Sequence, residues 1–72
     1  MEALPMEVRS TTIAHSYALG TKLHLVALRD VNGGPLEMRV LRNGELVTAV
    51  PARHAIVARL VYLREFKIAA KL

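Results

Sequence analysis

The residues in this sequence best suited to chemistry are four cations near its C-terminal end. They are Arg53, Arg64, Lys67 and Lys71. If the segment that follows Pro51 is helical, these side chains fall within an arc of about 60° around its axis, because one face of a helix recurs about every 3.6 residues. Such a line of cations can contact successive phosphates, or it can be a solvated face that keeps an apolar helix in water. We treat the four residues as candidate nucleic-acid contacts, with the solvated face as the alternative.

A fifth candidate contact, Arg39, lies in a β-prone segment. Seven of the ten basic residues are arginine, and a guanidinium group can bind a phosphate or carboxylate through two parallel hydrogen bonds. In an alternating strand pattern Arg39 shares a face with either His24 or Thr48. We therefore add Arg39 to the predicted nucleic-acid contacts.

Residue types that serve catalysis or metal binding are present but are not grouped. The chain has no cysteine, which excludes disulfides, thiolate nucleophiles and zinc sites with cysteine ligands. His15, His24 and His54 are far apart, and no pair has the i, i+4 spacing that places two ligands on one helical face. The glycines at 33–34 lack the lysine and the following helix of a phosphate-binding loop. We predict no enzyme activity, no metal site and no cofactor.

The elements that must position the cations are clearest at residues 36–50. Asn43-Gly44 separates two apolar runs, and this dipeptide favours the type I′ turn of a two-residue hairpin. The register that follows has these pairs: Arg42–Glu45, Leu41–Leu46, Val40–Val47, Arg39–Thr48 and Met38–Ala49. It places one set of side chains on a core-facing side: Leu36, Met38, Val40, Val47 and Ala49.

Two further segments precede this hairpin. Residues 22–30 alternate in the period of a strand, and both sides are fairly apolar, which indicates a central strand or a covered second face. Residues 6–19 fit a strand, but residues 14–21 could also share one helix face. The β-branched residues favour a strand for 6–14. Residues 1–5 are expected to fray.

The segment after Pro51 is predicted to form a helix that packs on the sheet. Apolar residues surround most of its circumference outside the cationic arc, which is more than one sheet face can cover. This excess indicates a second contact surface on the helix. The residues predicted for the core are Leu25, Met38, Val40, Val47, Val57, Val61 and Phe66.

Length and composition set outer limits on the fold. Seventy-two residues suffice for one domain, predicted to span 1–72. We expect an α+β fold, with a small antiparallel sheet of three or four strands followed by one C-terminal helix. Because 53% of the residues are hydrophobic and so small a domain hides little apolar surface, we expect a homodimer joined through the helix or the second sheet face.

The longest uncharged stretch, residues 10–21, is shorter than the roughly 20 residues of a bilayer span. We therefore expect no membrane contact and a cytoplasmic location.

The charge balance favours an anionic partner. The formal net charge is +4 and the sequence pI is about 10.1. We predict a small basic regulatory or accessory protein of bacterial or phage type, such as a transcription regulator, that binds nucleic acid. The predicted contacts are Arg39, Arg53, Arg64, Lys67 and Lys71. The alternative is an adaptor or inhibitor that binds a larger acidic enzyme through the apolar flank of the helix and its basic rim.

Overall fold

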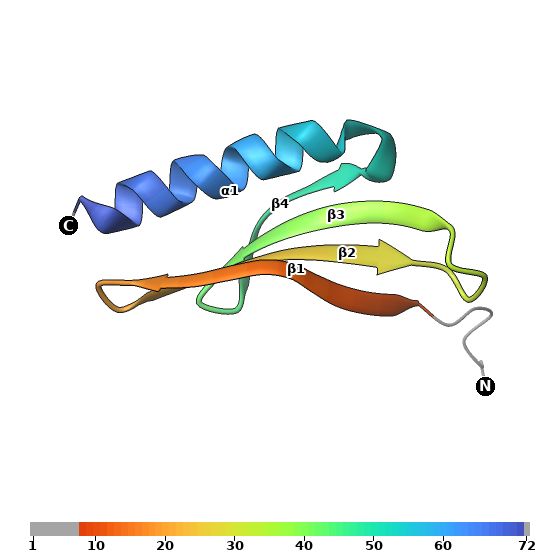
Figure 1. The fold of residues 1–72 in the computed structure, drawn as a ribbon, viewed down its shortest axis with the longest axis horizontal. Helices are drawn as coiled ribbons and strands as arrows, with labels where there is room; N and C mark the ends of the chain where they lie inside the picture. Colours follow the sequence, from red (N-terminus) through yellow and green to blue (C-terminus); the bar gives the residue numbers. More distant parts are fainter. Residues whose placement is uncertain (1–7, 72) are drawn as a thin grey trace.

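The computed structural model describes residues 8–71, which form a four-stranded antiparallel sheet with one helix packed on one side (Figure 1). The strands lie in the sheet in chain order. The elements are β1 (Arg9–Ala18), β2 (Thr21–Arg29), β3 (Pro35–Arg42), β4 (Glu45–Pro51), the 3₁₀ turn η1 (Ala52–His54) and α1 (Ala55–Ala70). This arrangement confirms the predicted α+β class. The fraying expected at residues 1–5 lies outside the described residues.

Strand β1 forms from the segment that the sequence left open between strand and helix. Its partners on β2 run from Arg9 opposite Arg29 to Ala18 opposite Thr21, so the helix considered for residues 14–21 does not form. The connecting turn explains why the strand continues so far. Leu19 and Gly20 have φ angles of 50° and 86°, the positive values that a type I′ hairpin turn requires.

The hairpin of β3 and β4 has the predicted turn but only part of the predicted register. Asn43 and Gly44 adopt φ angles of 53° and 84°, and the first two pairs, Arg42–Glu45 and Leu41–Leu46, are confirmed. Beyond them the predicted pairs are wrong, because Val47 is an extra residue in a β-bulge. The observed pairs are Val40–Thr48, Arg39–Ala49 and Met38–Val50.

The bulge changes which side chains of β4 face the helix. An extra residue reverses the side to which every later side chain points. Ala49, predicted to face the core, is therefore exposed. Val47 and Val50 both pack against the core instead. The shift brings the larger Val50 into the interior in place of Ala49, which gives a physical reason for the bulge.

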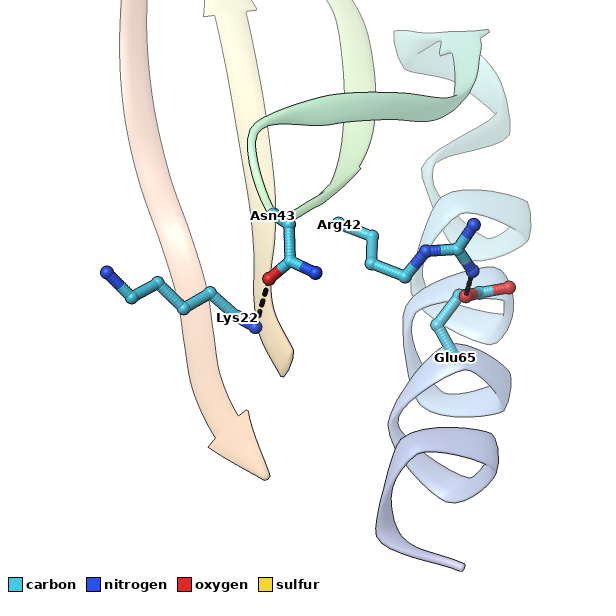
Figure 2. Close-up of polar contacts among 4 residues, drawn as sticks. All are labelled: Lys22, Arg42, Asn43 and Glu65. Carbon is cyan, nitrogen blue, oxygen red and sulfur yellow. Dashed lines mark hydrogen bonds and ion pairs between the residues drawn. The ribbon is translucent and has the colours of Figure 1, made fainter. Parts of the chain in front are cut away.

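Asn43 also ties the hairpin turn to the neighbouring strand. Its backbone N–H donates to the Lys22 carbonyl at 2.8 Å, and its side-chain oxygen accepts from the Lys22 N–H at 2.9 Å (Figure 2). Lys22 pairs with β1 on its other side. Asn43 therefore extends the hydrogen bonding of the sheet one step beyond the end of β3.

The core lies between the sheet and α1 and is small. Its buried residues are Leu23, Leu25, Ala27, Met38, Val40, Ala58 and Tyr62. The predicted core positions Leu25, Met38 and Val40 are confirmed, and Val47 and Val61 are half-buried at its margin. The Tyr62 hydroxyl donates to Ser16 Oγ on β1 at 2.9 Å, so this buried aromatic side chain also satisfies its polar atom.

The predictions that Val57 and Phe66 lie in the core are wrong. Their exposed fractions are 46% and 37%. The helix instead turns its smallest residues toward the sheet, with Ala58 and Ala69 buried and Ala55 half-buried. Alanine lets the helix backbone approach the sheet closely, which leaves the larger aliphatic residues on the outside.

The glycine-containing loop between β2 and β3 is closed by its own aspartate. Asp30 Oδ1 accepts hydrogen bonds from the N–H groups of Asn32 at 2.9 Å and Gly34 at 2.7 Å. A Cβ on Gly34 would lie 2.8 Å from the same carboxylate. This loop is therefore a tight turn built around Asp30.

A pair of valine substitutions tests the observed orientation of α1. Val40 is fully buried, and Val40→Ala removes two methyl groups there. This change should lower the free energy of unfolding by about 2 kcal/mol, because apolar burial is lost and a cavity remains. Val57→Ala should change it by less than about 0.5 kcal/mol, as at most exposed positions. Urea denaturation followed by circular dichroism at one protein concentration measures both. Equal losses would contradict the described orientation of the helix.

Candidate functional site

The side of α1 that faces away from the sheet combines large aliphatic residues with cations. We call this side the outer face of α1 and define it by Ile56, Leu60, Leu63, Arg64, Lys67 and Lys71, all of which are exposed. The exposed fractions are 69% for Ile56, 61% for Leu60 and 51% for Leu63. These values are high for aliphatic side chains that lie next to one another on one helix. Exposed aliphatic side chains grouped in this way are typical of a surface that binds another molecule.

A shallow depression lies along the C-terminal half of this face. Leu60, Leu63 and Ile68 line it together with three cations, Arg64, Lys67 and Lys71. Aliphatic groups can bury against a partner here, while the cations at the margin can pair with its acidic groups. The depression thus offers a contact with an apolar and a charged component.

The charge of the outer face is all of one sign. The single acidic residue of α1, Glu65, points toward the sheet instead. Its side chain is 13% exposed and pairs with the Arg42 guanidinium at 2.5 Å (Figure 2). Among residues 8–71 the ion pairs are this one and the pair between Arg39 and Glu37. Neither pair involves a cation of the outer face.

The five predicted contact residues do not form one site. Arg64, Lys67 and Lys71 share the depression, whereas Arg53 lies in η1 beside Pro35 and Leu36 at the other end of the helix. All four of these basic residues are exposed.

Arg39 is on the opposite side of the molecule. Its neighbour Val40 is buried toward the helix, so Arg39 points to the helix-free side of the sheet, where it pairs with Glu37. It shares that side with His24, not with Thr48, because the bulge turns Thr48 toward the helix. Arg39 therefore cannot contribute to a contact made by α1.

The helix-free side of the sheet is a second uncovered surface, which we call the open face. The register of the sheet shifts at Ile13 in β1, at Leu36 in β3 and at Val47 in β4. With these shifts, the alternation of the strands places the following residues on the open face: Tyr17, His24, Val26, Leu28, Leu41 and Leu46. Val26, Leu28 and Leu41 are half-buried by their neighbours, and Leu46 is 56% exposed. The alternation of residues 22–30 indicated an apolar second side of β2, and the open face is that side extended across the sheet.

The open face also carries a pair of histidines. His15 and His24 are cross-strand partners whose ring centroids are 6.2 Å apart. Within the described part of the chain, no group of three or more His, Cys, Asp or Glu residues is placed to hold a metal ion. Among the same residues no helix is long and apolar enough to cross a membrane.

Comparison with protein-family models, curated proteins and solved structures finds no match. The functional argument therefore depends on the two surfaces themselves.

The ion pair between Arg42 and Glu65 can be tested with a double-mutant cycle. Because Glu65 is mostly buried and holds the hairpin end against α1, Glu65→Gln should destabilise the fold, and Arg42→Ala should cost much less once Glu65 is replaced. The coupling between the two changes should be about 0.5 to 1 kcal/mol, since Arg42 is half exposed. Urea denaturation of the four proteins measures it, and additive effects would show that the pair does not stabilise the fold.

Proposed function

We propose that this chain is a small, basic, non-enzymatic regulatory or accessory protein, and that the outer face of α1 binds an acidic protein partner. The observation that carries this proposal is the exposure of Ile56, Leu60 and Leu63 on the same helix face as the cations. A helix that presents aliphatic residues at such spacing is a common contact element between proteins.

The aliphatic side chains supply the affinity in this proposal. Complete burial of a leucine or isoleucine stabilises a complex by roughly 1.5 to 3 kcal/mol. More than half of the surface of Ile56, Leu60 and Leu63 is still exposed, so each retains about half of that gain for a partner. Part of the total is lost to the entropy of association.

The cations supply selection among partners. Arg64, Lys67 and Lys71 surround the depression, and complementary charge speeds encounter and disfavours basic competitors. An acidic surface with an apolar centre therefore matches the outer face better than a neutral one.

Nucleic acid is the second candidate ligand for this surface. It is favoured by the exposure of Arg53, Arg64, Lys67 and Lys71 and by the lack of any acidic residue on the outer face. We rank it second because contacts to phosphates are polar and charged and give no role to the exposed aliphatic residues. The outer face also carries no aromatic side chain on which a base could stack.

Affinity capture with matched baits tests the first proposal. The wild-type protein and Arg39→Ala should retain one acidic protein from a nuclease-treated lysate of the source cells, and Leu60→Glu should lose it. Titration of that purified partner should then show binding about tenfold weaker, or more, for Leu60→Glu, equivalent to 1.4 kcal/mol, and binding that falls as salt is raised. A partner held equally by all three baits would place the binding surface elsewhere.

Salt titration tests the second candidate. If the cations contact phosphates, the affinity for a labelled DNA duplex should fall with salt with a log–log slope of about −0.9 for each contact. Replacing Lys67 and Lys71 by alanine should then make the slope shallower by about 1.8, while Leu60→Ser leaves it unchanged. Fluorescence anisotropy measures both, and no binding at low salt would reject nucleic acid.

A further inference from the structure

We propose that a second copy of this chain packs on the open face of the sheet and forms a two-fold symmetric dimer through it. The two sheets would then lie face to face between the two helices, and both outer faces of α1 would remain available to partners. The assignment of the open face to self-association does not depend on which ligand the outer face binds.

The open face has the composition of a surface that is covered. Val26 and Leu28 lie in its centre on β2, and Leu41 pairs with Leu46 across β3 and β4. Tyr17 and Leu46 are 68% and 56% exposed. Side chains of this kind on two facing sheets can interdigitate in a layer about 10 Å thick.

The charges of the open face suit contact with a copy of itself. Lys22, the cross-strand partner of Tyr17, adds a cation near one end of this face. At its centre Glu37 and Arg39 already form an ion pair. Across a two-fold axis each could meet its opposite from the other copy, because the same patch supplies both signs.

The outer face of α1 has the reverse property. A two-fold contact there would bring Arg64, Lys67 and Lys71 of one copy against the same cations of the other, with no acid on that face. Like charges placed opposite each other cost free energy. Charge therefore directs a second copy to the sheet and a different, acidic molecule to the helix.

The edges of the sheet are poorly suited to pairing between copies. Both edge strands carry a bulge, at Ile13 in β1 and at Val47 in β4, and β4 ends at Pro51. Bulges and proline are common means of blocking the addition of a strand to an edge. This leaves the face, and not an edge, as the place of association.

Complete contact between two open faces would just reach the size of a specific interface. Strands of seven to ten residues, at about 3.3 Å per residue and about 4.8 Å between strands, give a face of roughly 500 Å². Two copies would bury about 1,000 Å², which is the lower limit for a specific interface. The small core adds a reason for association, since Leu23 and Val40 are its only fully buried large side chains among residues 8–71.

Three lysine substitutions test this proposal by sedimentation equilibrium over a concentration series. Wild type and Leu60→Lys, which alters the outer face of α1, should both be dimers. Val26→Lys, at the centre of the open face, and Leu46→Lys, at its exposed margin, should each raise the dissociation constant about tenfold or more. Far-ultraviolet circular dichroism checks that each variant is folded. If Val26→Lys does not fold, Leu46→Lys still decides the test, because its side chain lies at the exposed margin of the face.

Each other result overturns the proposal. A monomeric wild type removes the dimer itself. A dimer lost in Leu60→Lys but kept in the open-face variants assigns self-association to the helix, and a dimer unaffected by all three assigns it to a strand edge. Failure of the proposed function is separate, because it is measured by partner binding to Leu60→Glu and not by the oligomeric state.

Discussion

The contact between α1 and the sheet is made largely by alanine, and most other features of the structure depend on this choice. Ala55, Ala58 and Ala69 lie on the side of the helix that faces the strands, with Tyr62 among them. Small side chains permit close approach but fill little volume, so the core is thin. Because the alanines face the sheet, Ile56 and Leu60 lie on the outside of the helix. A helix that is apolar on most sides has therefore buried its alanines around Tyr62 and exposed most of its larger aliphatic residues.

Polar contacts fix the sheet and helix where apolar packing is thin. The hydroxyl of Tyr62 reaches Ser16 on β1, and Arg42 at the end of β3 reaches Glu65 on α1. Asn43 joins the turn of the last hairpin to Lys22 on β2. Together these contacts connect three strands to one another and to the helix, and Figure 2 shows two of them, Arg42 with Glu65 and Asn43 with Lys22. They define the position of α1 more specifically than alanine packing alone would.

Local signals in the sequence predicted the strands and the helix, whereas the details that depend on packing were not predictable from it. Asn43-Gly44 specifies its turn through backbone preference, and the two pairs next to it follow from the turn alone. The bulge at Val47 depends on which valine fits under the helix, which is a property of the assembled core. The rotation of α1 was undetermined because apolar residues surround most of it. The sequence identified the cations as a surface feature, but only the sheet register shows that Arg39 lies on the far side from Lys67.

The alanine side of α1 also has a consequence for how this protein can change. Stability depends on one side of the helix and recognition, in our proposal, on the other, so few side chains serve both. Substitutions at Leu60 or Lys67 can alter what the surface recognises without weakening the fold. A lineage carrying this domain could thus exchange one partner for another through single replacements, each intermediate remaining folded.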